Sequence, residues 1–600
     1  MPGLFFYFNK DKSEKKKALE RISTPEDFCF NEVFSDDNLT IGNIKYECYP
    51  VEVFKNKKYI ITLEGCIYNK PDKINLQKEL IEIADFVFDE SIDNKQKLQS
   101  WLKDSDGDFV LSIFRNSDKK IFFLNDILGR LPLYYFQGEN EFVLTRDFSQ
   151  IPNLLPDVSI DKMALAQTLL FGYALGKRTL LNNIFCLDAA TLLVFDANEF
   201  VVNSENINDL NFENKENIEK STDDVNKNLY EYFLEATKNR AEISKNNLLS
   251  LSGGLDSRAI LSAFDNLKLP IKCATYSDAD HLVEKDVEAA KQLADIYNSE
   301  LEIVELQKSK GKDVLELLQI KMGMNYLGMS FILPFFKKIN KNNLSCFTGD
   351  GGDKVLPDLR PNKNISGINN LIKYIISQNK IFSLNDVVKI LNIDKNEILE
   401  ELRKILKSYP EKSMKQKYVH FLISERTMKW LFEGEDRNRS FFRSVSPYYS
   451  FKFFDYAMNC PDEMKKDYKL FRLFLERLSP EMAAVNNANW DIPVTSEKLK
   501  IFFLKNKIRS LIPQSIKKNI KSGFKKNNYL INYKAAVVEC FGKQFKACDY
   551  LNSVFNIDEL KKIKYLTEDE FYYLFTLTSV IEKTKTGKSS IRGFEDKIFI

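Results

Sequence analysis

The chain has 600 residues, enough for about three or four domains, or for fewer if they are large. Its 87 lysine and arginine residues nearly balance 85 aspartate and glutamate residues, so the net charge of +2 leaves no field to attract nucleic acid or an anionic membrane at long range. Hydrophobic residues at 44% and aromatic residues at 13% indicate a folded globular chain and exclude collagen-like and largely disordered proteins.

The beginning of the chain lacks the pattern of a secretory signal, because in MPGLFFYFNKDKSEKKK the basic cluster follows the apolar run. We find no run of about 18 apolar residues, so we expect a cytoplasmic protein without a membrane span. The nine cysteines are scattered without a CxxC pair, which argues against a zinc ribbon or a disulfide scaffold, and we expect buried thiols. We expect structural roles for the two histidines, His281 and His420.

The first part of the chain alternates short β-branched and aromatic runs with polar or glycine-containing turns, a pattern typical of a sheet-rich module. These runs lie at 58–69, 108–136, 141–148 and 191–202. The next segment, about 203–228, is polar, charged and nearly free of large apolar residues, which predicts an exposed linker. We therefore divide the chain into an N-terminal domain, 1–205, and a C-terminal domain, 206–600.

Beyond the linker, predicted strands alternate with predicted helices, which indicates a parallel, doubly wound sheet. Strands are expected at 246–252, 270–277 and 300–306, and helices at 225–242, 258–267 and 283–298. In the last helix, apolar residues recur at helical spacing and predict one buried face, made of Val283, Val287, Ala290, Ala294 and Tyr297. Residues 365–480 are rich in helix signals, with starting caps at Ser383/Asp386 and Asp394/Glu397.

The strongest chemical signal is LLSLSGGLDSRAIL, 248–261, in which an apolar strand runs into glycines and a helix begins at once. Glycines allow backbone N–H groups to approach an anion, the hydroxyls of Ser252 and Ser257 can donate, and a helix N-terminus favours negative charge. The pattern predicts a pyrophosphate cradle. Because Asp256 by itself would repel phosphates, we expect it to bind Mg²⁺ that bridges them.

An ordinary strand-to-helix turn, capped by a serine and an aspartate, is the alternative interpretation of this motif. A P-loop is excluded, because its Lys-Ser/Thr ending is absent. The segment TGKSS near the C-terminus contains Gly587-Lys588-Ser589, but Glu582 stands where a P-loop needs glycine. We therefore expect that tail to be solvated.

A second signal is CFTGDGGDKVLP, 346–357, which also follows a predicted strand. Its glycine-permitted turn places Asp350 and Asp353 three residues apart. One carboxylate can complete a Mg²⁺ site with Asp256, while the other faces the reacting carbon. A plain Asp-Gly turn is the alternative interpretation, and the presence of the first motif favours the functional one.

These motifs resemble those of the asparagine-synthetase-type amide ligases, a family that includes β-lactam synthetases and lasso-peptide macrolactam cyclases. The resemblance spans nearly the whole chain. It implies an α/β protein with an N-terminal αββα, Ntn-hydrolase-like sandwich, followed by a doubly wound parallel-sheet ATP-pyrophosphatase domain with a helical C-terminal part. It also implies ATP and Mg²⁺ as cofactors, because such enzymes transfer AMP to a carboxylate, release pyrophosphate and let an amine attack the acyl-adenylate.

By this resemblance SGGLDS corresponds to the family's ATP pyrophosphate loop, and the implied nucleotide-binding residues are Ser250, Ser252, Gly253, Gly254, Asp256, Ser257, Thr348 and Gly349. Asp256 and Asp353 are the implied ligands of Mg²⁺-pyrophosphate. Asp350 is the implied general base for the attacking amine or for the tetrahedral intermediate. The second motif usually ends in Asp-Glu in the family, and Lys354 stands in place of that glutamate.

Two weaker matches supply further candidates. FEGEDRNRSFFRSVSPYYS, 432–450, resembles the family's acidic segment ahead of an Arg-x-x-Pro stretch, and we compare Glu435 with the second member of the lactam-forming dyad. A structural ion pair between Asp436 and Arg437 is the alternative for this segment. IKSGFKK, 520–526, resembles the family's Lys-x-Gly-Phe segment, in which Lys521 would neutralise charge on the adenylate and the leaving pyrophosphate. A charged surface loop is the alternative there.

The N-terminal domain resembles class II glutamine amidotransferases in framework and departs from them in chemistry. MPGLFF, EGCIYN and DILGRLPLYY are similar to the family's Met-Cys-Gly-Ile, Asn-Gly-Glu-Ile-Tyr-Asn and Asp-x-x-Gly-x-x-Pro-Leu-Tyr-Tyr segments. Pro2 stands at the position of the nucleophilic cysteine and supplies no thiol. Glu64 replaces an asparagine of the oxyanion hole and would put a negative charge beside a developing one. We therefore expect glutamine hydrolysis to be lost.

The predicted function is an ATP-dependent carbon–nitrogen ligase that adenylates a carboxylate and transfers it to an amine without glutamine hydrolysis. Its partners are small-molecule or peptide carboxylates and amines, with no nucleic acid and no membrane, and a homodimer is left open. Three alternatives stay open: a glutamine-hydrolysing asparagine synthetase, an intramolecular lactam or macrolactam synthetase, and a nucleotide-binding pseudoenzyme. The absence of a CxxC pair and of a basic surplus speaks against tRNA thiolation.

Overall fold

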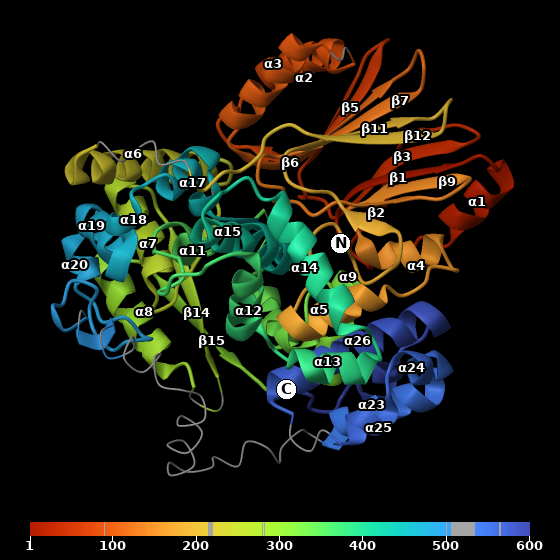
Figure 1. Ribbon diagram of the computed structural model, residues 1–600. Helices are drawn as coiled ribbons and strands as arrows, with labels where there is room; N and C mark the ends of the chain where they lie inside the picture. Colours follow the sequence, from red (N-terminus) through yellow and green to blue (C-terminus); the bar gives the residue numbers. More distant parts are fainter. Residues whose placement is uncertain are drawn as a thin grey trace.

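The computed structural model describes residues 1–88, 91–213, 220–278, 280, 282–341, 343–499, 501–503, 505, 535–562 and 566–600. Within these residues, two antiparallel sheets near the N-terminus are followed by one parallel sheet and many helices (Figure 1). The protein is thus of the mixed α/β class.

The N-terminal domain is a sandwich of two six-stranded antiparallel sheets. The first sheet has the order β10-β8-β9-β1-β3-β2, with the bounds Ile184–Cys186, Tyr134–Gln137, Glu141–Thr145, Gly3–Asn9, Leu39–Lys45 and Cys29–Ser35. The second sheet has the order β12-β11-β7-β6-β5-β4, with the bounds Val201–Asn206, Thr191–Asp196, Lys120–Asn125, Gly107–Arg115, Tyr59–Ile67 and Val51–Lys55.

Alternation of side chains along β1 explains how the layers pack, because successive residues of a strand point to opposite faces. Phe6 and Phe8 lie in the core between the two sheets, where the ring centroids of Phe6 and Phe123 are 5.4 Å apart. Phe5 and Tyr7 lie in the core on the other face. The outer layers are α1 (Lys12–Glu20) and α4 (Ile151–Leu154) over the first sheet, and α2 (Lys73–Val87) and α3 (Ile92–Asp104) over the second, while α5 (Lys162–Phe171) packs against helices of the C-terminal domain. The expected αββα sandwich is confirmed.

The C-terminal domain is built on a five-stranded parallel sheet with the order β15-β14-β13-β16-β17. The strands are Leu301–Leu306, Lys272–Asp278, Asn247–Ser250, Ser345–Phe347 and Arg443–Val445. The order reverses at β13, because β14 lies on one side of it and β16 on the other. In open α/β sheets, ligands bind at such a switch point, outside the carboxyl ends of the strands.

Helices cover both faces of this sheet, as a doubly wound fold requires. On one face Leu249 and Phe347 lie in a core with α6 (Thr222–Ala241), α7 (Leu255–Leu267) and α8 (Glu284–Tyr297). On the other face Leu248 and Cys346 lie in a core with α9 (Gly311–Lys321) and α10 (Leu333–Ile339). The predicted alternation of strands and helices over residues 246–306 is confirmed.

The rest of the C-terminal domain is helical, also as expected. Its longer helices are α12 (Ile368–Asn379), α13 (Leu384–Leu391), α14 (Lys395–Ser408), α15 (Met414–Phe421), α16 (Phe432–Asn438), α17 (Phe451–Met458), α19 (Lys469–Leu478), α23 (Ala535–Ala547) and α26 (Glu568–Thr586). A π-helix, η3 (Leu422–Leu431), joins α15 to α16. The predicted caps are present: Ser383 accepts from the backbone N–H of Asp386, and Asp394 from that of Asn396.

The segments 203–228 and 586–590, both expected to be exposed, bury few of their described residues. In the segment 203–228, β12 continues to Asn206 and α6 begins at Thr222. Ile207 and Phe212 are buried, because these apolar side chains pack into the hydrophobic core. In TGKSS, 586–590, Gly587 and Lys588 are exposed and the other residues are half-buried, whereas the last ten residues of the chain pack against the core. Among them, Ile591, Phe594 and Phe599 are buried, and the N–H of Phe599 donates to the carbonyl of Ser309 at 2.8 Å, because three large apolar side chains gain more from burial than from exposure.

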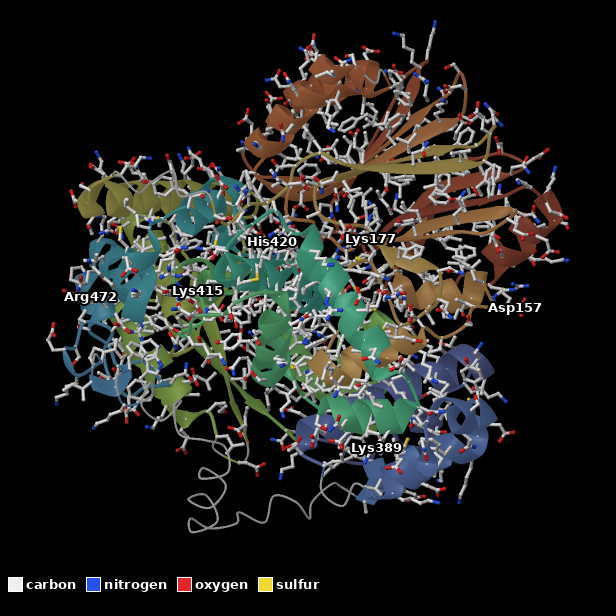
Figure 2. All side chains as sticks on the ribbon, in the orientation of Figure 1. Asp157, Lys177, Lys389, Lys415, His420 and Arg472 are labelled. Carbon is white, nitrogen blue, oxygen red and sulfur yellow. The ribbon has the colours of Figure 1, made fainter. Side chains whose placement is uncertain are left out.

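The remaining expectations have mixed outcomes. Helix α8 buries Ala290 and Ala294 of the predicted face, whereas Val283 and Val287 are half-buried. All nine cysteines are free, but Cys29 and Cys48 are exposed rather than buried, because they lie at an edge strand and in a surface turn. His420, labelled in Figure 2, has a structural role: it stacks on Tyr409 and its Nδ1 lies 2.8 Å from Glu411. His281 lies outside the described residues. None of the described helices has the length and apolar character needed to cross a membrane.

Candidate active site

The two glycine-rich loops meet at the switch point of the parallel sheet. One follows β13 and the other follows β16, and these strands pair with Leu249 opposite Phe347. The loops pack so closely that glycine is required in the second one. A Cβ atom on Gly349 would lie 2.9 Å from Cβ of Asp256, and one on Gly352 would overlap the Asp256 carboxylate. The fold therefore brings both predicted motifs to one place.

Most polar groups of the first loop bond within the loop or to an adjacent helix. The buried Ser257 hydroxyl accepts from Ser252 N and donates to Ser252 O, both at 3.1 Å. The N–H of Gly253 donates to Asp286 of α8 at 3.0 Å. Helix α7 begins at Leu255 without a side-chain cap, which leaves its N-terminus open to an anion. Contacts of Ser257 and Gly253 with a phosphate stay predictions.

Asp256 is held in an electrostatically unfavourable position. Its Oδ1 atom is buried and has no hydrogen-bond partner among the described residues. Burial, followed by the charges of Asp353 and Asp350, raises the pKa of Asp256 well above its ordinary value, although Lys354 opposes this shift. A buried carboxylate beside two others is stabilised by a cation, so the arrangement calls for one.

The donor set fits Mg²⁺, which prefers carboxylate oxygens and shares its coordination sphere with substrate phosphates. Asp256 and Asp353 would hold it, and the unpartnered Oδ1 of Asp256 is available to it. Across the described residues, His, Cys, Asp and Glu side chains form no group of three or more that could enclose a metal by itself. A metal held by Asp256 and Asp353 would need further ligands, which water or the phosphate oxygens of a nucleotide can supply.

Asp350 and Glu435 both lie close to Thr348. The Thr348 hydroxyl donates to Glu435 Oε1 at 3.3 Å, and Ser446 Oγ donates to the carbonyl of Asp350 at 2.6 Å. Burial and the nearby Asp353 raise the pKa of Asp350. Burial and Asp350 raise the pKa of Glu435 to about 7, although Arg130 lowers it. A carboxylate with a pKa near neutrality can accept and return a proton, which suits general acid–base catalysis.

Arg130 is the site residue that sequence reasoning missed. It comes from the N-terminal domain, has no exposed surface, and forms an ion pair with Glu435 and another with Asp108. Its guanidinium lies 4.3 Å from the ring centre of Phe432 and 4.2 Å from that of Tyr449. The segment DILGRLPLYY contains this arginine, but no local pattern connects it to a glutamate more than 300 residues away.

In the N-terminal domain, Glu64 fills the position expected for a catalytic asparagine, and its charge is balanced. Its Oε1 accepts from Tyr49 at 2.6 Å and from Arg146 at 2.9 Å, and its Oε2 accepts from the N–H of Leu4 at 2.7 Å. A Cβ on Gly3 would contact Arg146 and Glu64, so the space is filled. The negative charge expected at this position is present and is offset by Arg146. Pro2 supplies no thiol at the position of the nucleophile.

The alternative of an Asp436–Arg437 ion pair is also wrong. Asp436 pairs with Arg146 and with Lys321, whose Nζ lies 2.7 Å from Oδ2. Arg437 instead donates to Asn325 at 3.1 Å and to its neighbour Asn438. These opposite partners follow from the geometry of α16, on which successive side chains point in different directions.

Residues 41–205 match the family profile of the glutamine amidotransferase domain. No curated protein matches the chain. Similar solved structures include the glutamine phosphoribosylpyrophosphate amidotransferase from B. subtilis complexed with ADP and GMP, with 9% identity and a TM-score of 0.23, covering 69% of this chain and 94% of that one. The allosteric regulatory enzyme of purine biosynthesis has 10% identity and a TM-score of 0.22, covering 69% and 93%. NMN synthetase from Francisella tularensis has 15% identity and a TM-score of 0.18, covering 34% and 94%.

The part of the chain from 41 to 205 is thus a glutamine amidotransferase-type domain, and the match begins after Pro2. The solved structures, at these scores, carry no argument about function. Of the predicted site residues, the structure brings together Asp256, Thr348, Gly349, Asp350, Asp353 and Glu435, while Ser250 ends β13 just before the first loop. Lys354 forms an ion pair with Asp353. Lys521 lies outside the described residues.

Proposed function

We propose that this protein is an ATP-dependent ligase that adenylates a substrate carboxylate and transfers the acyl group to an amine, without hydrolysing glutamine. The observation that carries the proposal is the buried, unpartnered Oδ1 of Asp256 at the meeting point of the two loops. A carboxylate in that position is expected to bind a cation together with an anionic ligand. The open N-terminus of α7 beside it suits a phosphate.

In the first step, an oxygen of the substrate carboxylate forms a bond to the α-phosphorus of ATP, and the bond to the pyrophosphate oxygen breaks. The loop after β13 and the N-terminus of α7 bind the departing pyrophosphate. Asp256 and Asp353 would hold Mg²⁺, which when bound neutralises phosphate charge. The adenylate is then reactive toward amines, whereas a free carboxylate is not.

In the second step, the amine nitrogen forms a bond to the acyl carbon, AMP leaves, and the amine loses a proton. Asp350 lies in the same loop as Thr348 and Gly349 and is the proposed base. Glu435, which accepts from Thr348 and has a pKa raised to about 7, is the proposed second proton carrier. Lys521 stays a proposed binder of the adenylate and the pyrophosphate.

The amine comes from a source other than glutamine in this proposal. Pro2 offers no thiol, and Glu64 and Arg146 fill the space beside Gly3. Free ammonia, a second substrate and an amine within the carboxylate substrate all remain compatible with the site.

The test is substrate-dependent pyrophosphate release and exchange, with AMP and ADP measured as products. Asp256→Ala should abolish exchange, because it removes the cation ligand. Asp350→Ala should retain exchange and lose amide product. Asp157→Ala, at an exposed carboxylate labelled in Figure 2, is the matched control and should behave as the wild type. Formation of ADP, or exchange that survives Asp256→Ala, would contradict the proposal, and ammonia released from glutamine would favour a glutamine-hydrolysing enzyme.

A further inference from the structure

The loop that carries Arg130 is rigidly held within the N-terminal domain. The carboxylate of Asp126 accepts from the N–H groups of Leu128 and Arg130, both at 3.0 Å, and from that of Phe109 at 3.3 Å. Gly129, with φ of +66°, makes the turn between them. The backbone at Arg130 is therefore held by contacts within the N-terminal domain, and the side chain extends into the C-terminal domain.

The guanidinium of Arg130 lies in a slot of the C-terminal domain. The rings of Phe432 and Tyr449 line the slot, with the guanidinium carbon 4.3 Å and 4.2 Å from the ring centres, and Glu435 closes it. Both rings are buried. Aromatic faces attract a guanidinium, and a desolvated contact of this kind is stronger than an exposed one. Every part of the slot belongs to α16 or to the segment after β17.

We propose that Arg130 is a positioning residue of the amide-forming site, and that the N-terminal domain is a fixed part of that site because it supplies this arginine to Glu435. The inference rests on the proposed function and gives the amidotransferase-type domain a role that needs no thiol. Arg130 acts through Glu435: it orients the carboxylate toward Thr348 and supports its ionised form.

The charges around Glu435 give the sign of the effect. Arg130 from the N-terminal domain and Arg439, just after α16, favour the ionised carboxylate, whereas Asp350 from the second loop and Asp108 from β6 disfavour it. Burial also disfavours it, and Tyr449 lies nearby without a charge of its own near neutral pH. Removing the arginine charge leaves burial and two carboxylates opposed by Arg439 and by the hydrogen bond from Thr348, so Glu435 keeps its proton to higher pH.

The experiment compares Arg130→Met, Arg130→Gln and Arg130→Lys with Arg146→Met. Arg146 is the matched control, because it is also a fully buried guanidinium that joins the two domains, but it pairs with Glu64 and Asp436 rather than with Glu435. A general loss of stability should affect both positions. Circular dichroism and thermal melting check folding, and Arg130→Gln provides a second neutral side chain should Arg130→Met not fold.

The first readout is the infrared band of protonated Glu435, identified by its loss in Glu435→Gln. We expect the wild-type band to titrate near pH 7. In Arg130→Met and Arg130→Gln the midpoint should rise by about one to three pH units, because an adjacent opposite charge is removed. Arg130→Lys should return the midpoint most of the way to the wild-type value, and Arg146→Met should leave the wild-type midpoint unchanged.

The second readout separates the two half-reactions. Arg130→Met should retain pyrophosphate exchange while amide formation at neutral pH falls about tenfold or more and its pH profile moves to higher pH. An unchanged midpoint in a folded neutral variant, or an equal shift in Arg146→Met, would overturn the inference. If the wild type shows no substrate-dependent exchange, the proposed function fails, but the infrared titration still decides whether Arg130 governs Glu435.

Discussion

The guanidinium of Arg146 pairs with the carboxylate of Asp436 across the boundary between the two domains, and neither side chain has any exposed surface. Arg146 also binds Glu64, and Asp436 also binds Lys321. Lys321 in turn lies 2.6 Å from Glu433. Together these residues form a chain of alternating charges that runs from the amidotransferase-type domain into α16. Such a chain favours one relative position of the domains, because each buried charge needs its partner.

Removing one of these buried charges should destabilise the protein strongly. Asp436→Ala leaves Arg146 and Lys321 buried without part of their counter-charge, and we expect a loss of about 3–5 kcal/mol in the free energy of unfolding. Lys12→Ala is the matched control, since it breaks an ion pair with Asp37 in which both side chains are 71% exposed, and it should cost at most about 1 kcal/mol. Urea denaturation measures both. Equal losses of unfolding free energy in the two variants would contradict a structural role for the buried ion pairs.

Asp126 predicts a pH dependence of stability. Burial, with a smaller contribution from Asp108, raises its pKa from 3.8 to about 7. Between these two pH values the folded protein binds a proton that the unfolded chain has released. The contribution of Asp126 to the free energy of unfolding therefore falls as the pH rises, and it stays low above about pH 7. Asp126→Asn removes the titration and one acceptor. It should destabilise at both about pH 5 and about pH 8, but by about 2 kcal/mol less at the higher pH.

Thermal melting of wild type and Asp126→Asn at the two pH values tests this sign. The comparison uses differences between the two proteins, so the parallel contribution of Glu435, whose pKa is also raised to about 7, cancels. A penalty that is the same at both pH values would show that Asp126 does not hold a proton in the folded state.

Local patterns predicted much of this fold. The strands around the two motifs, the helix that starts at Leu255 and the caps at Ser383 and Asp394 all depend on residues close in sequence. The loops after β13 and β16 could also be identified as a candidate nucleotide site, because glycine, hydroxyl and carboxylate groups recur there at short spacing.

Long-range pairing could not be predicted in this way. The order of the parallel strands, which makes β13 the switch point, depends on contacts between segments about 100 residues apart. Arg130 meets Glu435, and Tyr134 meets Glu433, across some 300 residues. The partner that offsets the charge of Glu64 could not be identified, because Arg146 is distant in sequence. The π-helix η3 has an ordinary helical pattern of apolar residues, so nothing in its sequence indicated wider turns.

Lys354 should lower the requirement of the site for Mg²⁺. Its ammonium pairs with Asp353 and lowers the pKa of Asp256, so it offsets part of the negative charge at the two loops. Lys354→Glu adds a fourth carboxylate beside Asp256, Asp350 and Asp353. We expect ATP binding at low Mg²⁺ to weaken about tenfold, equal to about 1.4 kcal/mol, and to recover as Mg²⁺ is raised.

Equilibrium binding of ATP over a range of Mg²⁺ concentrations provides the measurement. Lys354→Met is the control for loss of the ammonium without an added negative charge, and its Mg²⁺ dependence should lie between those of the wild type and Lys354→Glu. An identical Mg²⁺ dependence of ATP binding in all three proteins would show that Lys354 does not affect the Mg²⁺ requirement of the site.

Replacing Gly352 by alanine should weaken nucleotide binding. A Cβ at this position would overlap the Asp256 carboxylate and lie 2.8 Å from the ring of Tyr448, so Gly352→Ala forces Asp256 away from the place where it would hold Mg²⁺. Overpacking of this kind costs about 1–3 kcal/mol, which predicts roughly ten- to hundredfold weaker ATP binding. Gly542→Ala, on helix α23 with open space around its Cβ, should bind ATP as the wild type does. Calorimetric titration of both variants with Mg-ATP decides the matter: unchanged affinity in Gly352→Ala would mean that the Asp256 carboxylate is not used for the nucleotide.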